Sequence, residues 1–105
     1  MQAVISGNVD KNVEVKNILL PDGSGFFELA ETSLSVRTNP DFDDCFKLRF
    51  TDKLIQIAQQ YILKGMLLSV VGQLEFEYWI ERETQEHKSC PVIIVSEIQL
   101  PPRFA

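Results

Sequence analysis

Alternating apolar and polar positions open the chain. Residues 3–16 are rich in β-branched side chains and pass through a short polar interval, which predicts one long strand. Strands at the corners of a small closed barrel bend sharply, so a kink is expected at Gly7 or near Asp10. The turn-forming residues of Pro21–Gly25 then predict a hairpin into a second strand.

The second predicted strand runs from Phe26 to about Val36. Its apolar positions change parity near Ala30 and Glu31, which predicts a bulge there. The polar stretch from Arg37 to Asp44 contains a proline and is expected to be an exposed loop.

The third predicted strand, residues 45–50, alternates strictly between two faces. Three apolar side chains share the face expected in the core: Phe46, Leu48 and Phe50. The other face carries Cys45, Lys47 and Arg49.

One helix is predicted next, with Thr51 or Asp52 as its N-cap. Its apolar residues recur at helical spacing: Leu54, Ile57, Ala58, Tyr61 and Ile62. Gly65 stands where a left-handed C-terminal cap belongs.

Two more strands complete the pattern. Residues 66–81 form the first, with Phe76, Tyr78 and Ile80 expected on one side and Glu75, Glu77 and Trp79 on the other. The charged run Arg82–Ser89 is expected to be a long hairpin loop. The last strand is Cys90–Leu100, ended by Pro101 and Pro102.

Three strands, one helix and two strands is the order of the oligonucleotide/oligosaccharide-binding (OB) barrel. In this all-β fold of five strands, the helix between strands three and four plugs the barrel bottom. The length of 105 residues suits one such domain covering residues 1–105.

The charge composition argues against nucleic-acid binding, and other sequence features indicate the cellular compartment. Fifteen acidic and ten basic residues give a net charge of −5, opposite in sign to the usual footprint of a nucleic-acid binder. No signal-peptide pattern opens the chain, and the longest apolar stretch, Met66–Val71, is too short to cross a membrane. With two cysteines that lack CxxC spacing and are interpreted as reduced thiols, a cytoplasmic or organelle-stroma setting is expected.

Catalytic chemistry has little support in the sequence. The single histidine, His87, lies in the charged loop without a nucleophile partner, and with two distant cysteines it makes a poor metal site. Glu75 and Glu77 are interpreted as surface residues rather than as an acid–base pair. We therefore expect no enzyme activity, cofactor, metal or small-molecule substrate.

Five segments, spread over residues 3 to 100, resemble the bacterial single-stranded DNA-binding proteins in order and spacing. They are Ile5–Val9, Leu29–Ser33, Phe50–Leu54, Ala58–Gly65 and Val70–Leu74. The resemblance implies the OB fold and a DNA-facing side lined by stacking aromatics and basic residues. A divergent member of that family is expected, from bacteria or plastids.

The departures from that family concern the DNA surface. Trp79 falls where a stacking tryptophan is expected, whereas Cys45 stands where another would be, and Glu75 and Glu77 replace common basic residues. The printed sequence ends without the family's acidic tail, so partner recruitment through a tail is not expected.

Binding a single strand without reading its sequence needs aromatic faces for the bases and cations for the phosphates. Eight residues are predicted to supply them: Trp79, Lys47, Arg49, Lys53, Arg37, Tyr78, Arg82 and Lys88. Phe26 and Phe42 are lesser candidates. Each of these cations alone is also compatible with ordinary solvated surface, and Trp79 with an interface or the barrel wall.

Two functions from different classes follow. The first is sequence-independent binding of single-stranded DNA in replication, recombination or repair. This binding is expected to be weak or salt-sensitive, because nearby carboxylates repel phosphates and few ionic contacts give low affinity. Oligomerisation is expected, since the first strand leaves an open edge, and the family resemblance implies a homodimer or homotetramer. The alternative is an OB barrel used for protein contact, or an accessory subunit similar to the primosomal B protein, with little or no DNA binding.

Overall fold

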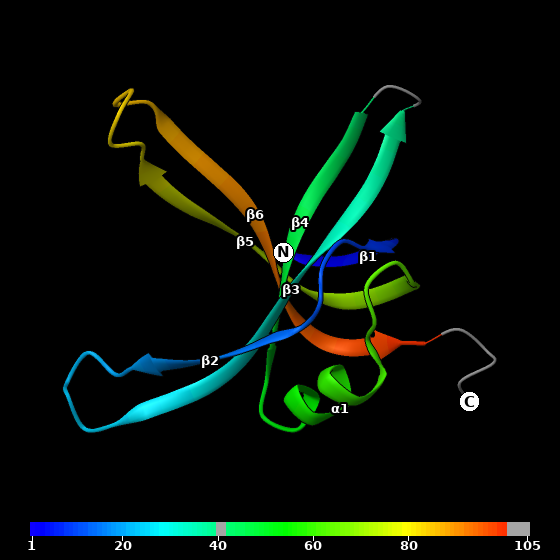
Figure 1. The fold of residues 1–105 in the computed structure, drawn as a ribbon, viewed down its shortest axis with the longest axis horizontal. Coiled ribbons are helices and arrows are strands. Elements are labelled where there is room, and N and C mark those ends of the chain that lie inside the picture. Colours follow the sequence, from blue (N-terminus) through cyan, green and yellow to red (C-terminus); the bar gives the residue numbers. More distant parts are fainter. Residues whose placement is uncertain (40–41, 101–105) are drawn as a thin grey trace.

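The computed structural model describes residues 1–39 and 42–100, which form a sheet with one helix (Figure 1). The elements are β1 (Gln2–Val9), β2 (Glu14–Leu19), β3 (Phe26–Asn39), β4 (Phe42–Thr51), α1 (Lys53–Tyr61), β5 (Leu67–Ile80) and β6 (His87–Gln99).

The sheet closes on itself. Its strand order is β1-β5-β6-β4-β3-β2, and β1 also pairs with β3 through Asn8 and Ser35. Among the strand pairings of the described residues, only that of β4 with β6 is parallel. Since β1 and β2 are the two halves of the first predicted strand, interrupted at residues 10–13, this is the expected five-stranded OB barrel.

The kink expected near Asp10 is confirmed by that interruption. Gly7 has another role. A Cβ atom at Gly7 would lie 2.4 Å from the Ser35 carbonyl oxygen, so glycine lets β1 approach β3 and close the barrel.

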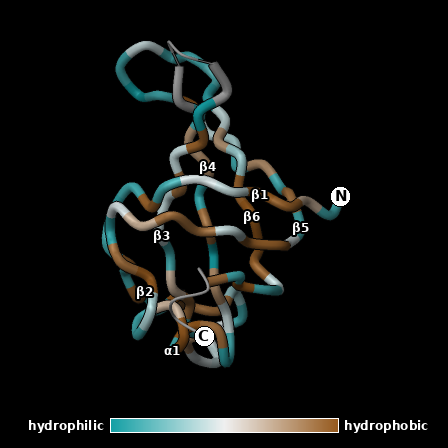
Figure 2. Tube along the Cα trace, turned by 90° about the vertical axis from the view of Figure 1, so that its right-hand side faces the viewer, coloured by the Kyte–Doolittle hydropathy of each residue, from teal (hydrophilic) through white to brown (hydrophobic). Residues whose placement is uncertain are grey.

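The core lies inside the barrel and beneath α1. Its largest fully buried side chains include Leu34 in β3, Leu48 and Phe50 in β4, Val70 in β5 and Ile93 in β6. Phe46 packs against this cluster, so the face predicted for residues 45–50 is confirmed. Figure 2 shows the hydrophobic positions gathered along the barrel strands.

Three of the five residues in the predicted apolar stripe contribute to the core: Leu54, Ala58 and Ile62. Ile55, Ala58 and Ile62 are buried, whereas Ile57 and Tyr61 are exposed. The helix has only nine residues and covers one end of the barrel, so a narrow stripe is enough. The prediction of Ile57 and Tyr61 as apolar contacts was wrong.

The predicted caps also differ. Asp52 precedes the helix, but its side chain makes no capping hydrogen bond. Gly65 has the positive φ expected of a left-handed residue, yet the helix ends at Tyr61. The Gly65 amide instead donates to the Val9 carbonyl oxygen at 2.7 Å, in the turn that leads into β5.

No bulge interrupts β3 at Ala30 and Glu31. Its register with β4 runs unbroken from Leu29 to Arg37 and shifts only beyond Arg37. The change of parity has another cause, because Ala30 and Leu34 point into the core while Leu29 lies on the opposite face. Apolar residues therefore occur on both faces of this strand.

Three hairpins extend beyond the barrel, β2–β3, β3–β4 and β5–β6 (Figure 1). Strands occupy most of the predicted loop Arg37–Asp44, and β6 begins at His87 inside the predicted loop Arg82–Ser89. Backbone pairing between neighbouring strands therefore continues through polar sequence. Residues 40–41 and the predicted stop at Pro101 and Pro102 lie outside the described residues.

Candidate nucleic-acid interface

One face of the sheet points away from the core across five strands. Residues that are partners on neighbouring strands point to the same side of a sheet. Lys16 in β2 is the partner of Leu29, Arg49 in β4 is the partner of Glu31, and Lys47 is the partner of Val92 in β6.

This surface is called the outer face. It includes Lys16, Ile18, Phe27, Leu29, Glu31, Arg37, Lys47, Arg49, Glu75, Glu77, Trp79, Lys88 and Val92. Alternation along each strand keeps these side chains apart from the barrel core.

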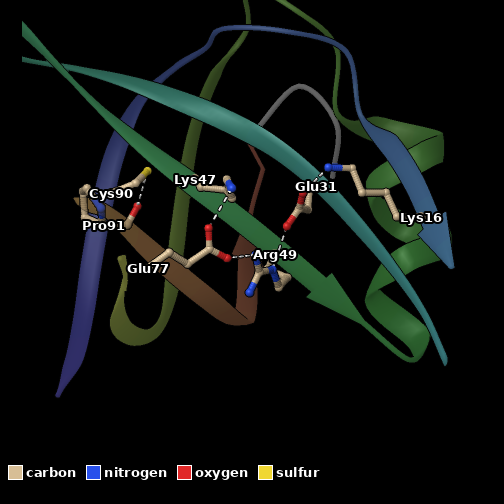
Figure 3. Close-up of polar contacts among 7 residues, drawn as sticks. All are labelled: Lys16, Glu31, Lys47, Arg49, Glu77, Cys90 and Pro91. Atoms are coloured by element: carbon tan, nitrogen blue, oxygen red, sulfur yellow. Dashed lines mark hydrogen bonds and ion pairs between the residues drawn. The ribbon is translucent and has the colours of Figure 1, made fainter. Parts of the chain in front are cut away.

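Five charged side chains form an ion-pair chain across the middle of the outer face (Figure 3). Glu31 accepts hydrogen bonds from Lys16 Nζ and Arg49 Nε, each at 2.7 Å. Glu77 accepts a hydrogen bond from Lys47 Nζ at 2.9 Å and a second from Arg49. Arg49 therefore joins the two carboxylates, and the chain carries one positive charge in excess.

The two carboxylates differ in exposure. The Glu31 side chain is 8% exposed and that of Glu77 is 36% exposed. Burial raises the pKa of Glu31, but the hydrogen bonds from Lys16 and Arg49 outweigh it and leave the pKa below its usual value. Hydrogen bonds from Arg49 and Lys47 lower the pKa of Glu77. Both groups are therefore ionised at neutral pH.

Stability should consequently fall in acid. A carboxyl group whose pKa is lowered by folding stabilises the protein above its ordinary pKa, and this contribution disappears as the pH falls through the lowered pKa. We expect the free energy of unfolding in urea to drop between about pH 6 and about pH 3, and to drop less in Glu77→Gln. Equal decreases in the two proteins would contradict a stabilising role for the ionised Glu77.

A groove of about 370 Å³ lies on the β2, β3 and β4 part of the outer face. The groove is lined by Lys16, Ile18, Phe27, Leu29, Glu31, Lys47 and Arg49. Apolar side chains and cations thus meet in one depression beside the ion-pair chain.

Trp79 is the outer-face aromatic of β5. Its side chain is 47% exposed and lies two residues beyond Glu77 on the same face, with Lys88 of β6 as its partner. Tyr78 is exposed on the opposite face, where its ring lies 6.4 Å from that of Phe76. A single strand on the outer face would contact Trp79 and not Tyr78.

The structure gathers five of the eight predicted site residues on the outer face: Arg37, Lys47, Arg49, Trp79 and Lys88. The remaining cations lie elsewhere, Lys53 at the start of α1 and Arg82 in the β5–β6 turn. Lys88 forms an ion pair with Glu86 at 2.9 Å. The roles of all eight residues in binding remain predictions.

The two lesser aromatic candidates for base stacking are Phe26 and Phe42. Phe26 is exposed, but it faces away from the outer face, because its neighbour Phe27 lines the groove. The Phe42 side chain lies outside the described residues.

Three groove residues were not predicted as site residues from the sequence: Lys16, Ile18 and Phe27. Pairing the two strands around the turn Pro21–Gly25 would have placed Lys16 opposite Leu29, on the same side as Phe27. The alternation was visible in each strand, but the register between them was not.

Other kinds of site find no support among residues 1–39 and 42–100. This part of the chain brings together no group of three or more histidine, cysteine or acidic residues that could hold a metal ion. Within the same ranges, no helix has the length and apolar character needed to cross a bilayer. Cys45 and Cys90 are free thiols.

Comparison with known proteins yields no matching family model. A protein from Nostoc sp. named single-stranded DNA-binding protein 1 is 39% identical over 64 residues, which cover 61% of this chain and 54% of the relative. This chain is thus similar in sequence to proteins named single-stranded DNA-binding protein. Another protein of that name, from Thermosynechococcus vestitus, is 37% identical over 60 residues, covering 57% of this chain and 50% of the relative. The chain spans about half the length of the curated relatives it matches.

Two solved structures of single-stranded DNA-binding proteins share the fold. The small protein from Streptomyces coelicolor superposes with a TM-score of 0.67 over 100% of this chain and 97% of that one, at 14% identity. The mitochondrial protein Rim1 from S. cerevisiae gives 0.69 over 95% and 93%, at 13% identity. The expected OB barrel and the predicted family resemblance are confirmed.

Proposed function

We propose that this chain is a non-catalytic OB domain, residues 1–105, that binds single-stranded DNA on its outer face without reading the base sequence. The observation that carries the proposal is the placement of Trp79 on the same face as Lys47 and Arg49. The indole offers a stacking surface to any base, and the cations attract phosphates. The names of the relatives support the same ligand.

Binding should be weak, with a salt dependence set by the few phosphates that the cations contact. The groove cations already contact Glu31 and Glu77, so a phosphate must compete with a carboxylate for them. Released counterions supply much of the affinity of protein for nucleic acid, and added salt removes that contribution.

The setting we propose is replication, recombination or repair in a bacterial cytoplasm or plastid stroma. We further propose a homodimer or homotetramer assembled through β1. This strand pairs with β5 on one side, while residues 2–7 have no strand partner on the other among the described residues. An open edge of this kind readily pairs with a second chain.

A second function is favoured by the charges. The chain has a net charge of −5, and carboxylates interrupt the cations of its outer face. An OB barrel that contacts proteins, or an accessory subunit similar to the primosomal B protein, would show these features with little DNA binding.

Titration with oligothymidine at low salt separates the two functions. We expect Trp79 fluorescence to be quenched and added salt to reverse the quenching. Trp79→Ala should lower the affinity about tenfold, as expected for loss of one base stack, when measured by anisotropy of labelled oligothymidine. Tyr78→Ala is the matched control on the opposite face and should bind like the unaltered protein. Absence of both quenching and an electrophoretic shift would favour the protein-contact function.

A further inference from the structure

Phe27 exposes an aromatic ring at a distance from Trp79. Its side chain is 42% exposed on the outer face, in the hairpin formed by β2 and β3. Ile18 is its partner on β2, and Leu29 follows it on the same face of β3. These three side chains line the groove together with Lys16.

The ring also borders a second hollow, of about 480 Å³, which includes Thr51 and Asp52 beside the start of α1. Phe27 thus stands between two depressions of the surface and is accessible from both. A flat ring in this position can stack with another flat group.

The charges around the groove indicate which kind of molecule would bind there. The groove is lined by Lys16, Lys47, Arg49 and Glu31, and Glu77 also pairs with Lys47 and Arg49. These five groups carry one positive charge in excess, in a chain whose net charge is −5. A second copy of this acidic chain is therefore a poor electrostatic match, whereas a polyanion with flat apolar rings is a good one.

We propose that Phe27, with Ile18 and Leu29, forms a nucleobase subsite, and that Lys16 contacts an adjacent phosphate. The inference rests on the proposed function and adds a second stacking position. Phe27 and Trp79 lie on opposite sides of the ion-pair chain, because β3 and β5 run in the same direction. Phe27 precedes Glu31 in β3, whereas Trp79 follows Glu77 in β5. The bound strand would cross Lys47 and Arg49 between two stacked bases.

The chain offers a matched control one residue away. Phe26 is 68% exposed on the opposite face of the same strand. Phe27→Ala should weaken binding of oligothymidine about tenfold, since one base stack is lost. Phe26→Ala removes a ring of the same size and should leave the affinity unchanged. Both are measured by anisotropy, with thermal unfolding as a check on the fold.

A relocated fluorophore gives an independent test. In Trp79→Phe combined with Phe27→Trp, the only indole reports on the proposed subsite, and oligothymidine should quench it. Unaltered affinity in Phe27→Ala, an unquenched indole at position 27, or a change of oligomeric state in Phe27→Ala without loss of affinity would each overturn the subsite while wild-type binding persists. If the wild-type protein itself does not bind, the proposed function fails and the subsite with it.

Discussion

Replacing Lys47 and Arg49 together with alanine is expected to lower the affinity for oligothymidine about 100-fold at low salt. Each cation contributes a charge-assisted contact to a phosphate, worth about 1.5 kcal/mol or roughly tenfold in affinity. The slope of log affinity against log salt should also become shallower by about 1.4, because two fewer phosphates are neutralised. Anisotropy titrations at several salt concentrations measure both quantities.

A matched pair of lysines separates this local effect from net charge. Lys53 is the first residue of α1 and Lys64 lies in the segment after its last residue, Tyr61, and both lysines are exposed. Replacing both with alanine removes the same two charges away from the outer face. Equal losses of affinity in the two double variants would contradict a specific role for Lys47 and Arg49. Thermal unfolding checks the first variant, because Glu31 loses one of its two partners.

Glu77→Lys should have the opposite effect and strengthen binding by about tenfold or more, with a steeper dependence on salt. Glu77 holds Lys47 and Arg49 at the positions where phosphates would approach them. Its side chain is much more exposed than that of Glu31, so a phosphate can displace Glu77 more easily. Glu77 is therefore the carboxylate that competes most directly with DNA.

Glu75→Lys is the control for this variant. Glu75 is exposed on the same face two residues earlier, and its replacement changes the net charge by the same amount. We expect a smaller gain, since Lys47 and Arg49 keep their contacts with Glu77. A gain equal to that of Glu77→Lys would show that overall charge, and not release of the two cations, controls the affinity.

Where only one face of a strand is buried, the alternation of apolar and polar residues was enough to predict which side chains lie in the core. Residues 45–50 obey it, and Leu48 and Phe50 are fully buried as predicted. The order of strands and helix likewise predicted the barrel. The alternation was misleading in β3, because Leu29 and Ala30 are both buried on opposite faces of one strand.

The candidate site was less predictable because it depends on register and on long-range pairing. Glu31 and Arg49 are 18 residues apart, and Arg49 and Glu77 are 28 residues apart. Nothing in the local sequence shows that these charges meet. Clustering of cations on the third predicted strand was visible, but their neutralisation by Glu31 and Glu77 required the folded sheet.

The most direct test of the central claim is to map the bound strand by NMR. Oligothymidine is titrated into the isotope-labelled protein at low salt, and the amide and indole signals are followed. We expect the shifts to concentrate at Glu31, Lys47, Arg49 and Trp79, with few at α1. Shifts confined to α1 and to exposed residues of β1, or no shifts at all, would contradict binding on the outer face.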